Sequence, residues 1–545
     1  MYASLAAERQ VPQSQKGMEQ LYLKQNLQLE PLFNQWYAWP QLIAPATAAM
    51  HVANSHVKIM KSYIMAPAVH AAAVKNPAMR GGPFLDFDSR RVHEIKTLLD
   101  RTLKERAHLI AFADAIKTFN QTLVNEAKGH SLEGLYARVP DLLKGYVELV
   151  YDVNNNCTIR FVERLLYHSP YYDESAQSIS LSLVERDDRP FVFSTPRMED
   201  EQHLHMRLPF RHSDIDDLFA MRERPQTLAY VKDRLGLDDK YDTLLSSFLT
   251  EEKPKPSRNG NAAGVTVRYF GHACILVEYR GLSLLTDPIV GYDFPDSVPR
   301  YTFADLPEHI DFVLLTHAHS DHVVFESLLQ LRHKIRTVIV PRCRGGALED
   351  PSLKAIVEHT GFKNVMEIDE LESIKLSHGT ITAIPFWGEH GDLNISSKTG
   401  YLLEFGGTKI LCLADSNNLE PHLYEHVHRE TGDVDVVFLG MECVGAPVSW
   451  MYGPLIMKPL DRVMDHSRRL NGSDCARGLD IIKRFNPKKV FVYAMGQEPW
   501  VSFITTIKYT EESKPIVESN HFVEACRSQG IEAERLFGSR ELQGL

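Results

Sequence analysis

The feature that most constrains this chain is a group of histidines placed directly after an apolar segment. Residues 312–316 read FVLLT, which predicts a buried strand, and residues 317–322 read HAHSDH. Four residues of this second stretch can ligate a metal: His317, His319, Asp321 and His322. In a loop at the end of a strand, the first two can point one way while the last two point another. The segment therefore predicts a site for two metal ions rather than one.

A helix cap is the alternative interpretation of the same segment. Ser320 or Asp321 can cap a helix that begins near His322. A cap does not need three histidines, however, whereas three imidazoles with a carboxylate are competent to hold zinc or iron. We therefore favour the metal site.

Length and composition limit the classes of protein that the chain can belong to. With 545 residues it is too long for one hydrophobic core, so two or three domains are expected. The formal net charge of -11 argues against a nucleic-acid-binding protein. No apolar stretch approaches the about 20 residues that span a bilayer, and residues 1–10 do not resemble a secretory signal. The seven cysteines are dispersed and form no CxxC pair, which is typical of reduced thiols in a cytoplasmic protein, and no membrane partner is expected.

A polar stretch divides the chain into two parts. Residues 251–261 contain two prolines and a glycine without apolar periodicity, and we assign a linker to residues 251–264. Before it, apolar residues recur at helical spacing between residues 91 and 125, and residues 178–184 alternate like a strand. Residues 1–250 are thus predicted to form a helix-rich, mixed α+β domain.

Strands dominate the part after the linker, residues 265–545. Helical patterns at residues 321–332 and 475–485 separate some of the strands. Two sheets covered by helices, an αββα sandwich of the α/β class, suit this order. The strand-like runs are residues 265–270, 274–279, 282–287, 312–316, 337–340, 380–384, 401–405, 409–413, 434–439 and 489–493.

Further potential ligands lie at the ends of these strands. Asp287 and Asp415 each end a strand, and residues 385–392 read PFWGEHGD. In their order and context, these segments resemble the metallo-β-lactamase superfamily. The resemblance implies that the HxHxDH residues and Asp415 ligate two metals, with Asp415 as the bridge. It also implies that Asp287 orients a metal ligand from behind.

Two departures from the usual superfamily pattern argue against an ordinary two-zinc hydrolase. The third motif normally ends in a single histidine, but here Glu389 precedes His390, so either residue can be the ligand. The last motif normally supplies a histidine, but residues 491–496 read FVYAMG. Glu442 and His466 are candidates for this seventh position, and for both a surface or supporting role is an equal alternative. Residues 449–454, SWMYGP, are expected to line a pocket or to be buried for packing.

Together these features resemble the diiron β-hydroxylases of nonribosomal peptide pathways, of the type that acts in chloramphenicol biosynthesis. The resemblance covers nearly the whole chain. It implies that Glu389 replaces the histidine of the third motif, with His390 as the alternative, and that Glu389 and Asp415 are catalytic. The implied metal ligands are His317, His319, Asp321, His322, Glu389 and Asp415.

The same resemblance implies an activity and a set of partners. The expected enzyme is a monooxygenase with two iron ions, O2 as co-substrate and an external electron donor such as a reductase or ferredoxin. It hydroxylates the β-carbon of an amino acid that is tethered to a peptidyl-carrier domain. The N-terminal domain is expected to dock the carrier and to form a homodimer.

The donor chemistry agrees with iron. Carboxylates are hard, anionic donors, so exchanging an imidazole for a carboxylate favours the higher oxidation states of iron. Zinc has no redox chemistry. A dinuclear zinc hydrolase of a lactone, thioester or phosphodiester remains the main alternative, because one fold hosts many activities. A catalytically silent docking protein is the second alternative, and the intact HxHxDH segment and Asp415 argue against it.

Overall fold

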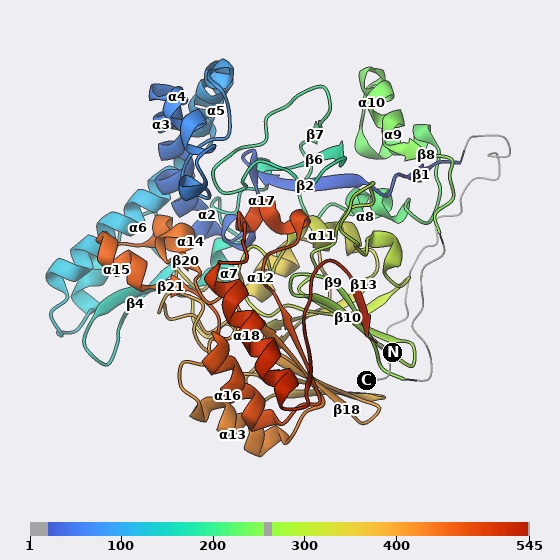
Figure 1. The fold of residues 1–545 in the computed structure, drawn as a ribbon. Coiled ribbons are helices and arrows are strands. Elements are labelled where there is room, and N and C mark those ends of the chain that lie inside the picture. Colours follow the sequence, from blue (N-terminus) through green and yellow to red (C-terminus); the bar gives the residue numbers. More distant parts are fainter. Residues whose placement is uncertain (1–19, 256–263, 543–545) are drawn as a thin grey trace, which may run out of the picture.

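The computed structural model describes residues 20–255 and 264–542 (Figure 1). Most of the predicted linker at residues 251–264 lies outside these ranges, as do residues 1–10, where no signal sequence is expected. Across the described ranges, no helix combines the length and the apolar character needed to span a membrane.

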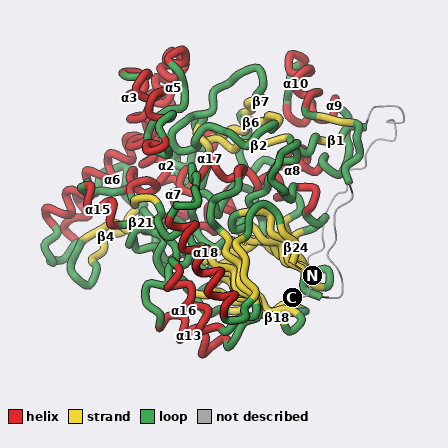
Figure 2. The backbone as a smooth tube through the Cα atoms, in the orientation of Figure 1, coloured by secondary structure: helices red, strands yellow, loops and turns green. Residues whose placement is uncertain are grey.

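Two seven-stranded sheets form the centre of the C-terminal part (Figure 2). In the first sheet, the strands from β11 to β14 run parallel, whereas β24, β9, β10 and β11 pair antiparallel. Its spatial order is β14 (Val365–Ile368), β13 (Ile335–Pro341), β12 (Ile310–Leu314), β11 (Leu282–Thr286), β10 (Cys274–Tyr279), β9 (Thr266–Gly271) and β24 (Arg540–Leu542).

The second sheet has a similar plan. The strands from β15 to β18 form antiparallel hairpins, and β18, β19, β22 and β23 continue in parallel. Its spatial order is β15 (Ser373–Leu376), β16 (Gly379–Ile384), β17 (Gly400–Phe405), β18 (Thr408–Cys412), β19 (Val436–Gly440), β22 (Lys489–Tyr493) and β23 (Glu532–Arg535).

Three hydrophobic cores show how the layers stack. One core lies between the facing surfaces of the two sheets and includes Val277, Leu403 and Phe438. Another joins the outer face of the second sheet to α13 (His422–Thr431), α16 (Cys475–Phe485) and α18 (Lys514–Ser528). The third joins the outer face of the first sheet to α11 (Phe325–Leu331) and α12 (Leu353–His359). The order helix, sheet, sheet, helix confirms the predicted αββα sandwich.

The N-terminal part is mixed, as predicted, and packs directly on the sandwich. The region predicted to be helical contains α5 (Val92–Glu105) and α6 (Ala107–Glu126). A small sheet has the order β3 (Trp36–Tyr37), β2 (Leu27–Phe33), β6 (Gln177–Leu183) and β7 (Leu204–Met206). The largest hydrophobic core runs without a break from this sheet to α11 and the first sheet of the sandwich. Polar contacts reinforce the junction, since the Tyr37 hydroxyl donates a hydrogen bond to Glu326 at 3.0 Å.

Two expectations about the segment after β12 are corrected by the structure. The helix predicted for residues 321–332 is shorter, because only α11 (Phe325–Leu331) is helical and the residues before it form turns. The cap interpretation is also wrong. The N-cap of α11 is Val324, and no side chain caps it. Asp321 and His322 are therefore not used to begin the helix.

Candidate metal centre

The predicted ligands lie in loops that leave one edge of the sandwich. Asp287 directly follows β11, residues 317–322 follow β12, and Asp415 follows β18. Glu389 and His390 lie in the loop between β16 and β17. Parallel strands deliver their carboxyl ends to the same edge, so segments far apart in the chain meet there.

Unusual backbone conformations mark these loops. Glu389 has φ 67°, Asp287 has φ 32° and Ala414, before Asp415, has φ 45°. A left-handed conformation costs a non-glycine residue about 1–3 kcal/mol and persists only where its surroundings enforce it. Gly388, with φ 79°, permits the turn that presents Glu389, because a Cβ there would lie 2.5 Å from Cβ of Asn417.

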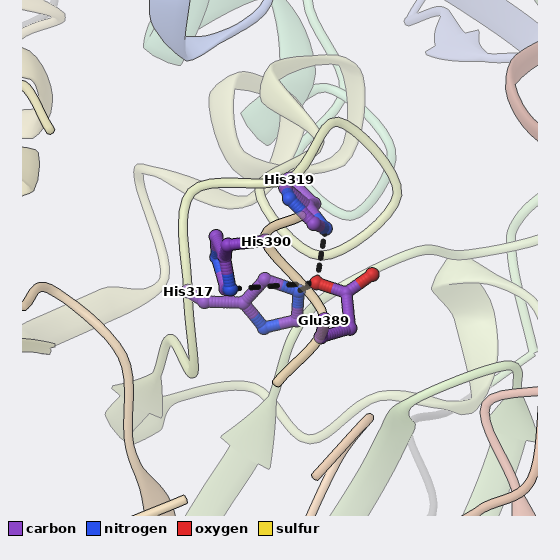
Figure 3. A group of neighbouring side chains, drawn as sticks. All are labelled: His317, His319, Glu389 and His390. Atoms are coloured by element: carbon purple, nitrogen blue, oxygen red, sulfur yellow. Dashed lines mark ion pairs between the residues drawn. The ribbon is translucent and has the colours of Figure 1, made fainter. Parts of the chain in front are cut away.

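The first group of converging side chains contains His317, His319, Glu389 and His390 (Figure 3). Their potential ligand atoms all lie within 4.8 Å of one another, and all four residues are buried. Glu389 Oε2 lies 2.6 Å from His319 Nδ1, 3.4 Å from His317 Nε2 and 3.7 Å from His390 Nδ1. The histidines thus surround one carboxylate oxygen.

Glu389 and His390 both face this position, although they are adjacent in the sequence. In an extended strand, neighbouring side chains point to opposite sides. The left-handed backbone at Glu389 breaks this alternation and turns both side chains inward. Adjacency in the sequence therefore does not decide between them. The Nδ1 atom of His390 lies 3.1 Å from the carbonyl oxygen of Gly388, which leaves its Nε2 atom without a hydrogen-bond partner in the described residues.

Asp415 links this group to a second one. Its Oδ2 atom lies 2.8 Å from His322 Nε2 and 3.9 Å from His317 Nε2. His317, His322 and Asp415 form one set of converging atoms, and His322 also belongs to a set with Asp321 and His272. Asp415 therefore lies between the two halves of the centre.

Asp287 contacts Thr316 and His322 and fixes their positions. It accepts hydrogen bonds from the backbone N–H and the hydroxyl of Thr316, at 2.8 and 2.6 Å. Its Oδ2 atom lies 2.8 Å from Nδ1 of His322. An Nδ1–H that donates to Asp287 leaves the Nε2 atom of His322 facing Asp415, which is the geometry of a carboxylate that orients a metal-ligating histidine.

Two side chains at the centre were missed by the sequence analysis. His272 lies in the turn between β9 and β10, where its Nδ1 atom accepts the backbone N–H of Gly496 and its Nε2 atom lies 3.3 Å from Asp321 Oδ2. The hydroxyl of Tyr452 lies 3.1 Å from His319 Nε2, which leaves Nδ1 of His319 for the centre. The signals available were a histidine next to Gly271 at a strand end and the aromatic segment at residues 449–454.

The two candidates for the seventh ligand position, His466 and Glu442, lie in different places. His466 is exposed on α15 (Arg462–Ser467), and the structure does not bring it to the centre. Glu442 follows β19 and lines the same cavity as Asp321, Glu389 and Asp415, but it belongs to none of the converging groups of the described residues. This cavity has a volume of about 320 Å³, and Trp450 and Met451 of the predicted pocket segment form part of its wall.

Buried polar atoms without hydrogen-bond partners indicate that the centre fits metal ions. In the part of the chain that the structure describes, five buried atoms here have no hydrogen-bond partner: His272 Nε2, His317 Nε2, Glu389 Oε2, His390 Nε2 and Asp415 Oδ1. Buried polar atoms are normally paired, so atoms that approach each other without forming hydrogen bonds point to a shared cation. Imidazoles with several carboxylates suit two iron ions.

The pKa values of the centre follow from burial and from neighbouring charges. Burial, assisted by the neighbouring histidines, holds the pKa of His317 well below its usual range, so this imidazole is neutral and able to ligate. Burial opposes a charge on His322, but Asp415 and Asp287 outweigh it and raise its pKa. Burial raises the pKa of Glu389 to about 7, against the opposing effect of His319. A bound cation would favour the ionised carboxylate.

Comparison with known proteins identifies the class and the family. Residues 283–472 match the family model of the "Beta-lactamase superfamily domain". Residues 22–254 match that of the "Diiron non-heme beta-hydroxylase N-terminal domain". The sandwich and its centre thus define a member of the metallo-β-lactamase superfamily. A Streptomyces venezuelae protein named 4-amino-L-phenylalanyl-[CmlP-peptidyl-carrier-protein] 3-hydroxylase is 38% identical over 96% of this chain and 99% of its own length. The chain therefore belongs to the diiron non-haem β-hydroxylases, a family whose cofactor is two iron ions.

Similarity extends to the three-dimensional structure. The crystal structure of CmlA, a diiron β-hydroxylase from Streptomyces venezuelae, superposes with a TM-score of 0.90 at 37% identity, covering 96% of this chain and 99% of that one. A UPF0173 protein of Pyrococcus abyssi is 28% identical over only 27% of this chain and 59% of its own length. Both the N-terminal part and the sandwich are thus shared with CmlA.

Proposed function

We propose that this enzyme uses O2 to hydroxylate the β-carbon of an amino acid held as a thioester on a peptidyl-carrier domain of a nonribosomal peptide synthetase. The observation that carries the proposal is Glu389, a carboxylate among the histidines where a zinc hydrolase of this superfamily normally has only imidazole. The activity for which the Streptomyces relative is named supports a carrier-bound amino acid as substrate.

The proposed roles of the side chains follow from their contacts. Asp415 would help to hold both iron ions, because it lies between the two halves of the centre. Glu389 supplies the carboxylate of the first position, and Asp287 fixes the orientation of His322. The proposed ligands are His317, His319 and Glu389 for one iron, Asp321 and His322 for the other, and Asp415 for both. His390 remains the alternative to Glu389.

When bound, iron supplies the redox chemistry that activates O2 with electrons from an external donor, for which we propose a reductase or ferredoxin-type protein. The chain supplies the chamber for the amino acid. Its cavity of about 320 Å³ is walled by apolar side chains that include Met451, Met495 and Ile504. These walls exclude bulk water from the side of the substrate and hold its β-carbon next to the centre.

We also propose a division of labour between the two parts. Residues 1–250 dock the carrier and form a homodimer, residues 251–264 connect the parts, and residues 265–545 hold the metal centre. The match of residues 22–254 to a distinct N-terminal family domain supports this division. Light scattering of the purified protein measures the dimer directly, and a monomer at micromolar concentration would contradict it.

Metal analysis combined with a carrier assay tests the main proposal. Protein purified without added metal should contain about two irons per chain and should add one oxygen atom to an aminoacyl carrier when O2 and a reductant are present. Mass spectrometry of the released amino acid measures the product. Two tightly bound zinc ions, thioester hydrolysis and no oxygenation by the iron-loaded form would establish the zinc-hydrolase alternative instead.

A further inference from the structure

We propose that Glu442 binds the α-ammonium group of the aminoacyl substrate and so selects amino acids over acyl groups without an amine. The inference rests on the proposed function, because it requires an aminoacyl thioester in the cavity. It concerns a side chain outside the converging metal groups of the described residues.

The cavity contains few charged groups apart from those of the centre. Its ionisable lining residues within the metal groups are His272, His319, Asp321, Glu389 and Asp415. Among the described residues, Glu442 and Arg80 are the remaining charged side chains of the lining. Arg80 is exposed and cationic, so it would repel an ammonium group. Glu442 is the carboxylate that the centre leaves available.

Glu442 also lacks a cationic partner of its own. Its carboxylate accepts backbone N–H groups of Val444 and Gly445, at 3.3 and 3.1 Å. No lysine, arginine or histidine of the described residues forms an ion pair with it. Neutral N–H donors do not offset the charge, and burial raises the pKa of Glu442. A carboxylate that faces a cavity without a counter-ion is a receptor for a cationic ligand.

The chemistry of the substrate places a cation in the same chamber. The α-nitrogen of an amino acid lies two bonds from the β-carbon, at roughly 2.5 Å. When the β-carbon lies at the metal centre, the ammonium group must therefore be inside the cavity as well. The carboxylates of the centre would hold the metal ions, and these cations would compensate their charge. Glu442 compensates the ammonium group.

A neighbouring hydroxyl completes the polar surroundings. Tyr509 lies close enough for the charge of Glu442 to contribute, after burial, to the raised pKa of the tyrosine. Its buried hydroxyl has no well-formed hydrogen bond with any described residue. It is therefore available to orient the carboxylate or to accept an N–H of the ammonium group.

Binding of matched carriers to the full-length iron-loaded enzyme tests the inference. One carrier domain is loaded with 4-amino-L-phenylalanine, the amino acid named for the Streptomyces relative. A second is loaded with 3-(4-aminophenyl)propionate, which differs only by the missing α-amine. A third is loaded with L-phenylalanine, which lacks only the ring amine. Dissociation constants and kcat/KM are measured for the wild type and for Glu442→Gln, a variant that keeps an acceptor for the N–H groups of Val444 and Gly445.

The wild type should prefer both amino acids over the propionate by about 10- to 100-fold, the range expected for a hydrogen bond to a charged group. Glu442→Gln should remove this preference by weakening only the aminoacyl carriers, with its iron content unchanged. Glu524→Gln on α18 removes one exposed charge and should behave as the wild type.

Several results would overturn the inference. Equal use of the propionate by the wild type would show that the amine is not recognised, and a preference that survives Glu442→Gln would assign recognition to another group. Selective weakening of the carrier with the ring amine would place Glu442 at the side chain of the substrate. Loss of iron from Glu442→Gln would make it a metal ligand. If the wild type neither binds nor oxygenates any carrier, the proposed function fails, and this inference fails with it.

Discussion

Two groups of buried histidines lie in different parts of this protein, and their surroundings differ. In the sandwich, His317 and His322 converge with the carboxylates of Glu389 and Asp415. In the N-terminal part, His51 precedes a π-helical turn (Val52–His56), His56 ends it, and both are buried. Neither of them belongs to a converging group of potential ligands in the described residues.

Aromatic rings and an amide surround the N-terminal pair. His56 stacks on Trp36 with ring centroids 3.9 Å apart, and His51 Nε2 lies 2.9 Å from the amide oxygen of Gln41. Burial lowers the pKa of His51 to about 3. The comparison teaches that burial lowers the pKa of His51 and of His317 alike, but only converging carboxylates make a buried imidazole part of a candidate metal centre.

Removing the carboxylate between the two halves should have the largest effect. In Asp415→Ala, two cations would face each other without the charge that separates them, so we expect one iron or none and loss of oxygenation. Iron analysis and the carrier assay measure both. Two irons at wild-type affinity would show that the bridge lies elsewhere and would weaken the contrast between the two groups of histidines.

The next largest effect is expected for the adjacent residues Glu389 and His390. Glu389→Ala should abolish oxygenation and change the visible spectrum of the iron, because it removes the anionic donor among the histidines. His390→Ala should keep two irons, with activity or metal affinity reduced by about 10- to 100-fold, as for a residue that supports the ligands. An essential His390 and a dispensable Glu389 would favour the zinc-hydrolase alternative.

A smaller effect is expected for Asp287, which orients the proposed ligand His322. Asp287→Asn keeps the shape but removes the charge that holds Nδ1–H of His322. We expect about 10- to 100-fold weaker iron binding, read from competition with a chelator. Asp311→Asn, an exchange at a carboxylate near the opposite end of β12 that pairs with Arg336, is the matched control and should not change iron binding. Unchanged affinity in Asp287→Asn would remove this residue from the centre.

The smallest effect is expected in the N-terminal part and concerns stability rather than metal. His51 is neutral when folded and has an ordinary pKa of 6.5 when unfolded, so its contribution is complete above pH 6.5 and is lost as the pH falls towards 3. At pH 5 the loss lowers the free energy of unfolding by about 2 kcal/mol. Denaturant titrations at pH 7 and pH 5 should show a smaller acid-induced loss in His51→Gln, with iron content at pH 7 unchanged. A loss of iron would contradict the distinction between the two groups.

The sequence determined the class of fold and most of the candidate ligands, because both leave local patterns. Alternating apolar runs define strands, and HAHSDH after one of them combines ligand residues at short spacing. Asp287 and Asp415 were found for the same reason, since each follows a strand. The helix at residues 475–485 matches α16 (Cys475–Phe485) because its apolar residues repeat at helical spacing.

Only the tertiary structure decided how these residues meet. His272 is separated from Asp321 by 49 positions in the sequence, and no local pattern connects them, yet the pairing of β9 and β10 brings it within 3.3 Å of that carboxylate. The inward turn of both Glu389 and His390 depends on a left-handed backbone that its surroundings enforce. His466 was a candidate by its residue type alone, and the fold leaves it on an exposed helix. Ligand types are properties of residues, whereas convergence is a property of the packed strands and loops.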